Sequence, residues 1–254
     1  MREEFNLKNA DRKKTFFILI SFLAIYVIWG STFLAIKVVV ESAPAFFSMG
    51  VRFIIASLLL ALFLPFSKGV KYRKREILNS AILGVFFFAG CMGLVAWAEK
   101  YIPSGIACVL SSTIPLWFLV FEVLLYKKRR PRIVAWLGVI TGIVGVIVLV
   151  GIKDFTHLKH STYLPFLAVL FASILWSFTA IYSTKVDKPK NKKLDVSVQM
   201  FAGGIFNIIL SLITKELNDF SLGVYNALNL SALLYLTLFG SMLTLLAFNY
   251  LLDN

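Results

Sequence analysis

Eight separate runs of apolar residues divide this sequence of 254 residues. Each run is about 20 residues long, which is enough for a helix to cross a hydrocarbon core of roughly 30 Å. The runs cover residues 15–36, 44–65, 77–98, 104–125, 133–151, 163–184, 196–214 and 230–252. A chain with this pattern is expected to cross a membrane several times.

The runs are expected to be helices, because backbone N–H and C=O groups find no water in lipid and must pair within the segment. Composition agrees, since 59% of the residues are hydrophobic and only 15% are charged. Soluble domains carry roughly a quarter charged residues. A cytosolic enzyme and a disordered chain are therefore excluded. We predict an all-α polytopic membrane protein with eight transmembrane helices.

Lysine and arginine alternate between the two sides of the predicted bundle. Four clusters of five lie at the amino terminus and between runs two and three, four and five, and six and seven, whereas the opposite connections hold five in all. Such an excess marks cytoplasmic loops, so we predict a multi-pass protein of the cell membrane with both termini in the cytoplasm. These loops account for the net charge of +13 and meet anionic lipid, so the bilayer is an expected partner and nucleic acid is not.

The sequence contains an internal repeat. Residues 80–100 align without gaps to residues 231–251 at an offset of 151, with six identities, and residues 28–32 similarly match 175–179. We predict a first unit of five helices over residues 1–152 and a second, incomplete unit of three over 153–254. A unit with an odd number of helices inserts its second copy upside down, which is typical of alternating-access transporters. By this count the ten-helix (5+5) architecture lacks its last two helices.

Two stretches resemble a known family. Residues 28–37, Ile-Trp-Gly-Ser-Thr-Phe-Leu-Ala-Ile-Lys, followed by Arg52, resemble the opening of EamA-type drug/metabolite transporters. Residues 96–107, Ala-Trp-Ala-Glu-Lys-Tyr-Ile-Pro-Ser-Gly-Ile-Ala, followed by 111–117, Ser-Ser-Thr-Ile-Pro-Leu-Trp, are similar to the segment joining helices 3 and 4 in the subgroup of YedA-like exporters.

The resemblance implies two EamA repeats that move small organic solutes out of the cell. It also implies a central cavity lined chiefly by helices 1, 3, 4, 6, 8 and 9. The chain departs from the family pattern after helix 4, where Lys128-Arg129-Arg130 stands in place of a frequent Gly-Glu-Arg turn.

Three cavity candidates lie on the fourth run. Ser111, Pro115 and Glu122 fall near one line when the run is drawn at 100° per residue. Glu122 is predicted either to bind a coupling proton or contact a cation, or to pair its charge with Lys127 and Lys128 near the membrane interface. Pro115 is predicted to interrupt the helix, either as a transporter device or as a packing kink.

Three tryptophans are candidates for stacking on a substrate, namely Trp29, Trp97 and Trp176. The repeat pairs Trp29 with Trp176, and both lie near the middle of their runs. Trp97, beside Glu99, fits the aromatic belt at the membrane interface better.

The other cavity candidates are small hydroxyl residues, which also mark plain helix contacts in membranes. They are Ser31, Thr32, Ser177, Ser241 and Thr244. Arg52 lies about 12 Å deep in the second run at 1.5 Å per residue. We interpret it as a structural charge that reaches Glu41, Glu99 or backbone carbonyls, and a contact with a substrate carboxylate is the alternative.

No enzyme chemistry is predicted. The two histidines, His157 and His160, fall in one outer connection, and the two cysteines offer no metal-ligand spacing. No cofactor is expected.

We predict a secondary transporter that exports small metabolites such as amino acids. The alternatives are a multidrug or nucleotide-sugar carrier, or a truncated chain that does not transport, and assembly as a homodimer is left open.

Overall fold

The computed structural model describes residues 2–64, 72–126, 133–150, 163–218 and 221–244, together with Ala247 and Leu251. Within these ranges the chain is helical and contains no strand. The helices are α1 (Arg2–Val40), α2 (Ala45–Ala61), α3 (Lys74–Gly84), α4 (Leu94–Glu99), α5 (Ser104–Ser111), α6 (Ile114–Tyr126), α7 (Ile133–Val150), α9 (Tyr163–Ser183), α10 (Lys192–Ile213) and α11 (Ala227–Tyr235). Two π-helical segments, η1 (Val85–Gly93) and η4 (Leu236–Leu243), and a 3₁₀ turn, η3 (Leu222–Val224), complete the order.

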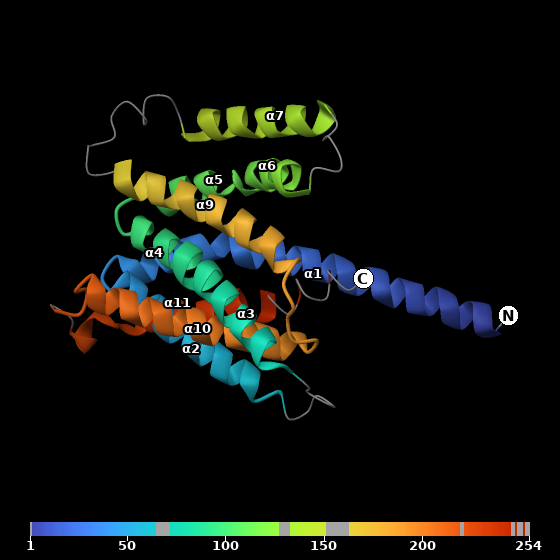
Figure 1. Cartoon of the computed structure of the whole chain (residues 1–254), viewed down its shortest axis with the longest axis horizontal. Helices are drawn as coiled ribbons and strands as arrows, with labels where there is room; N and C mark the ends of the chain where they lie inside the picture. The colour runs from blue at the N-terminus through green and yellow to red at the C-terminus, as the bar shows by residue number, and fades with distance from the viewer. Residues whose placement is uncertain are drawn as a thin grey trace.

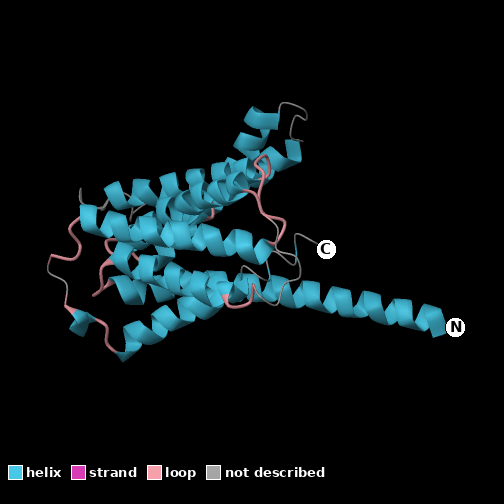
Figure 2. Ribbon diagram, turned by 60° about the horizontal axis from the view of Figure 1, so that its bottom comes forward, coloured by secondary structure: helices cyan, strands magenta, loops and turns pink. Residues whose placement is uncertain are grey.

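Each of the eight predicted runs overlaps one or more helices of the described chain, which confirms the all-α membrane fold. Five helical stretches of the described chain are long and apolar enough to cross a membrane, and three shorter apolar helices accompany them. The first helix is longer than predicted because seven of residues 2–14 are Lys, Arg or Glu, which favour helix. Its amino-terminal part extends beyond the other helices in both Figure 1 and Figure 2.

The two π-helical segments occupy matching positions in the sequence. Val85, where η1 begins, and Leu236, where η4 begins, are separated by the repeat offset of 151 residues. In η1 the carbonyl of Phe88 accepts a hydrogen bond from the Asn207 side chain of α10 at 2.9 Å. The division into units 1–152 and 153–254 stays a prediction, and its boundary lies outside the described residues.

One hydrophobic core joins α1, α2, η1, α4, α10 and η4. Its buried members include Met49, Phe53, Phe88, Met200 and Leu236. Helices α3 and α10 approach each other closely, because a Cβ built on Gly84 would overlap the main chain of Gln199. Figure 1 shows α10 lying beside α2 and α3.

A second core joins η1 and α4 to α5 and α9, with Cys91, Ile102, Leu110 and Val169 buried at its centre. Helix α7 lies at the edge of the molecule against α5 and α6 (Figure 1). Its apolar side chains are largely exposed, with Ile133 and Val148 more than 70% accessible. Such surfaces suit contact with lipid.

Beyond α10, Glu216 ties that helix to the start of α2. Its Oε2 accepts hydrogen bonds from the backbone N–H groups of Phe46 at 3.0 Å and Phe47 at 3.4 Å. These groups lie in the first turn of α2, where helices leave N–H donors unpaired. Burial raises the pKa of the Glu216 carboxyl above its ordinary value of 4.5, although these bonds and the charge of Lys100 oppose the shift.

Replacing Glu216 with glutamine is expected to weaken the pH dependence of stability. A carboxyl whose pKa is raised by folding stabilises the protein fully below its ordinary pKa of 4.5 and loses that contribution as pH rises through the folded-state pKa. The Glu216→Gln side chain still accepts from Phe46 but carries no charge. Melting temperatures in detergent between about pH 4 and pH 7 should therefore fall less than in the wild type. Asp187→Asn, at an exposed position, is the control, and an unchanged slope in Glu216→Gln would contradict the assignment.

Candidate functional site

Two tryptophans that the repeat pairs with each other lie in contact. Trp29 of α1 and Trp176 of α9 meet edge to face, with ring centroids 6.4 Å apart. Phe87 of η1 packs against the same Trp176 ring at 4.9 Å. All three side chains are half-buried. Such rings offer apolar faces to a small molecule and the negative face of the π-system to a cation.

The next residues of α1 contact the last helices of the described chain. The Oγ of Ser31 lies 2.6 Å from the hydroxyl of Tyr235 in α11. A Cβ built on Gly240 of η4 would lie 3.0 Å from the Thr32 methyl carbon, so Thr32 packs directly on this backbone. Residues 29–32 thus connect α1 to α9 and to α11 and η4.

Arg52 lies beside this contact and is 2% exposed. Its Nε donates a hydrogen bond to Ser241 Oγ of η4 at 3.1 Å, and its Nη1 lies 3.5 Å from the sulfur of Met49. The guanidinium carbon also lies 4.8 Å from the centroid of the Phe53 ring. Among the described residues no carboxylate lies within ion-pair distance of Arg52. The ion pair found in this part of the chain joins Lys37 to Glu41 instead.

The fourth predicted helix is interrupted, as Pro115 predicts. Helix α5 ends at Ser111, two turn residues follow, and α6 begins at Ile114. Pro115 has no N–H with which to continue the hydrogen bonds of the helix. The carbonyl of Ile114 accepts a hydrogen bond from Ser177 of α9 at 3.1 Å, so the interruption is joined to the residue that follows Trp176.

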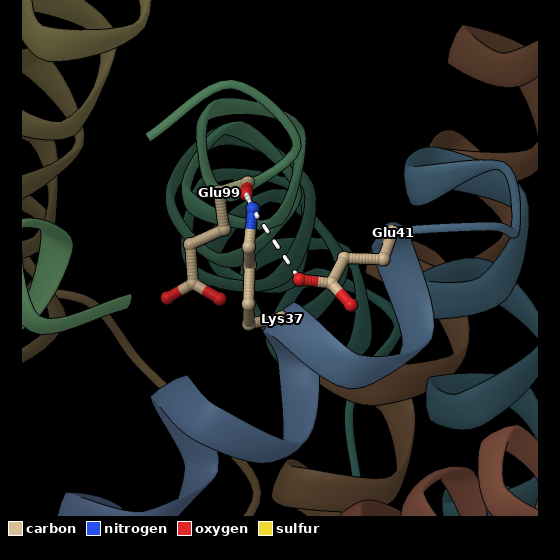
Figure 3. Close-up of polar contacts among 3 residues, drawn as sticks. All are labelled: Lys37, Glu41 and Glu99. Carbon is tan, nitrogen blue, oxygen red and sulfur yellow. Dashed lines mark hydrogen bonds and ion pairs between the residues drawn. The ribbon is translucent and has the colours of Figure 1, made fainter. Parts of the chain in front are cut away.

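Glu99, at the end of α4, is fully buried, and neither of its carboxylate oxygens has a hydrogen-bond partner among the described residues. Lys37 of α1 donates its Nζ to the main-chain carbonyl of Glu99 at 2.8 Å. The same Nζ lies 3.9 Å from Oε1 of Glu41. Figure 3 shows the amine between these two oxygens and the Glu99 carboxylate turned away from it.

The comparison with known families identifies the chain. The EamA-like transporter family matches residues 16–151, which is more than half of the sequence. The chain belongs to this family. The resemblance seen in residues 28–37 and 96–117 is thereby confirmed.

EamA relatives cover most of the chain. It is 34% identical over 233 residues to "Uncharacterized inner membrane transporter YedA" of Escherichia coli strain K12, covering 91% of this chain and 72% of the relative. It is 23% identical over 202 residues to "Uncharacterized transporter YoaV" of Bacillus subtilis, covering 77% and 67%. A solved crystal structure with 20% identity superposes with a TM-score of 0.65 over 93% of this chain and 78% of that one, which supports the fold. The chain is therefore a multi-pass membrane transporter.

In this EamA chain the structure brings several predicted residues into one cluster between the two predicted units. These residues are Trp29, Ser31, Thr32, Arg52, Trp176 and Ser241. Thr244 is fully buried next to it and donates to the carbonyl of Phe239 at 2.7 Å. Trp97 packs against both cores and against the Tyr101 ring at 5.3 Å.

The predicted stripe on the fourth helix stays apart from this cluster. Ser111 is half-buried, whereas Pro115 and Glu122 are exposed in the structure. A cavity role for these three residues stays a prediction, as does the structural role of Arg52. His157 and His160 lie outside the described residues.

Sequence reasoning missed several residues of this region, among them Phe87, Tyr235 and Glu99. Glu99 was placed at the membrane interface beside Trp97, but it is buried. The sequence does contain a signal for this burial, namely the short distance from Glu99 to Pro103. Helix α5 begins directly after Pro103, only five residues after Glu99. So short a turn between two apolar helices leaves little room for the side chain to reach water.

Proposed function

We propose that this chain is a secondary transporter that exports small metabolites such as amino acids by alternating access. The observation that carries the proposal is the Trp29–Trp176 contact, which joins matching positions of the two predicted repeats near the middle of their apolar runs. Inverted repeats that rock against each other bind their substrate at such an interface. The bilayer and a small-molecule substrate are the partners under this proposal, with both termini in the cytoplasm and no enzymatic activity.

The cluster offers the groups that an amino acid needs. Its aromatic faces contact apolar side chains or an ammonium group. The paired hydroxyls of Ser31 and Tyr235 accept and donate hydrogen bonds to an ammonium or a carboxylate. Export of preloaded amino acids from cells that express the protein tests the proposal. Retention equal to that of cells carrying an empty vector, across all amino acid pools, would contradict it.

Replacing Trp176 with alanine is expected to slow export about tenfold, because under the proposal this ring contacts the substrate and such a contact contributes about 0.5–1.5 kcal/mol. Trp176 contacts both Trp29 and Phe87, so one substitution removes both contacts. Trp136→Ala is the matched control, since Trp136 lies on α7 and is 40% exposed. Efflux rates are compared at equal protein levels. Wild-type export by Trp176→Ala would exclude this cluster as the binding site.

The multidrug alternative depends on Glu122, whose exposed carboxylate would meet a cationic drug. Glu122→Gln is then expected to abolish drug efflux while amino acid export continues. Unchanged drug efflux would remove this role from Glu122.

A further inference from the structure

The Glu99 side chain is completely buried at the end of α4. Its neighbours Ala98 and Ile102 are almost completely buried in the second core. Both of its oxygens are buried and lack a hydrogen-bond partner among the described residues. An isolated carboxylate anion in such a place costs far more free energy than the neutral acid.

Apart from Lys100, which follows it in the chain, few charged groups lie around Glu99. Helix α1 contributes Lys37, whose charge acts on this carboxyl, and α5 contributes Cys108. Helix α9 contains no Asp, Glu, Lys, Arg or His. On η1 the titratable side chain is the buried thiol of Cys91, and on α2 the guanidinium of Arg52 is bound to Ser241.

The Lys37 amine lies between the main-chain carbonyl of Glu99 and the carboxylate of Glu41. Lys37 is held at the main-chain carbonyl of Glu99 and lies at ion-pair distance from Glu41, whose side chain is 63% exposed. The Glu99 carboxylate, on the same residue as the carbonyl, points elsewhere (Figure 3). A neutral Glu99 explains this arrangement, since an anion would attract Lys37 more strongly than a water-exposed Glu41 does.

We propose that Glu99 is a proton-binding site of the transport cycle and that its protonation decides whether Lys37 pairs with Glu41 or with Glu99. The arrangement with Lys37 near Glu41 corresponds to the protonated form of Glu99. When the O–H bond breaks and the proton leaves, the resulting carboxylate draws Nζ away from Glu41. The new ion pair adds to the hydrogen bond that already joins Lys37 of α1 to the main-chain carbonyl of Glu99 in α4.

The switch lies close to the candidate binding site. Lys37 is five residues from Thr32 on the same helix, or about 8 Å at 1.5 Å per residue. A shift of α1 toward α4 therefore reaches the contacts of residues 29–32 with α9 and η4. The charge distribution of the loops predicts that Glu99 lies near the outer face. Proton entry there would accompany export, and this consequence rests on the proposed function.

The ligand is a proton rather than a metal ion. Metal ions such as Ca²⁺ and Mg²⁺ require several oxygen ligands. Among the residues that the structure describes, no group of three or more His, Cys, Asp or Glu side chains is arranged to hold a metal ion.

Infrared spectroscopy of the full chain in liposomes tests the site without any substrate. At pH 7 the wild type is expected to show the band of a protonated carboxyl, Glu99→Gln to lack it, and the matched variant Glu41→Gln to keep it. The same band in Glu99→Gln, or no such band in the wild type, would overturn the proposal. Because this measurement needs no transport, a failure of export in the same preparation counts against the proposed function alone.

Two further measurements complete the test. The first tests the role of Lys37 and does not require a folded Glu99→Gln variant, and the second tests coupling to export. Lys37→Met removes the cation that favours the anionic form, so its carboxyl band is expected to persist to higher pH than that of the wild type. An unshifted band contradicts the role of Lys37. In export assays, acid outside is expected to accelerate wild-type efflux but not that of Glu99→Gln, and an equal acceleration of both would show that Glu99 does not couple.

Discussion

Replacing Gly84 with alanine is expected to destabilise the protein more than the same change at any other glycine that the structure describes. A Cβ at this position would overlap the carbonyl oxygen of Gln199, so α3 and α10 must separate. Overpacking of a filled core costs about 1–3 kcal/mol, and more where backbone meets backbone. We expect a lower melting temperature in detergent and a smaller monodisperse fraction in size-exclusion chromatography.

A matched substitution and a second glycine sharpen this test. Gly142→Ala in α7 adds the same methyl group where no atom lies within 4 Å, so its stability should be unchanged or slightly raised. A Cβ on Gly203 would lie 2.5 Å from the carbonyl oxygen of Gly84. Both substitutions force apart the same crossing of α3 and α10. The Gly84→Ala/Gly203→Ala double variant should therefore lose less stability than the sum of the two single variants. Wild-type melting of Gly84→Ala would contradict the close crossing.

The helices of this fold were predictable because lipid imposes one strong rule, that long apolar runs become helices. All eight runs, and the interruption before Pro115, follow from that rule and from the missing N–H of proline. The residue pattern does not show which helices touch. Gly84 and Gly203 belong to separate runs, and only the tertiary structure shows that their backbones meet.

The candidate site was predictable where the repeat relates two residues, and where a polar side chain such as Arg52 or Ser241 lies inside an apolar run. The offset of 151 directed attention to the third and eighth runs, and the matching of residues 28–32 with 175–179 directed it to Trp29 and Trp176. Glu99 was missed because depth along a helix was the available measure, and that measure places it at the interface. Its burial depends on α1 and α5 packing over the end of α4, which no local pattern reveals.

Replacing Arg52 with alanine is expected to cost roughly 3 kcal/mol, because it removes a charged hydrogen-bond donor and the stem that fills a buried space. The side chain is 2% exposed and joins α2 to η4 through Ser241. For a chain of this size the loss corresponds to a fall of about 10 °C in melting temperature. Arg75→Ala, at an exposed position, is the control and should melt like the wild type.

The Ser241→Ala variant separates a structural tie from a substrate contact at Arg52. It leaves Nε of Arg52 buried without its acceptor, which costs about 1–3 kcal/mol. If the hydrogen bond is structural, Arg52→Ala and Ser241→Ala both remove the same interaction. The double variant should then lose less free energy of unfolding than the sum of the two single variants. Arg52→Lys keeps the charge but not the planar donor geometry, so it should rescue only part of the stability. Wild-type melting of Arg52→Ala, combined with lost export of carboxylate substrates, would instead make this guanidinium a substrate-binding group.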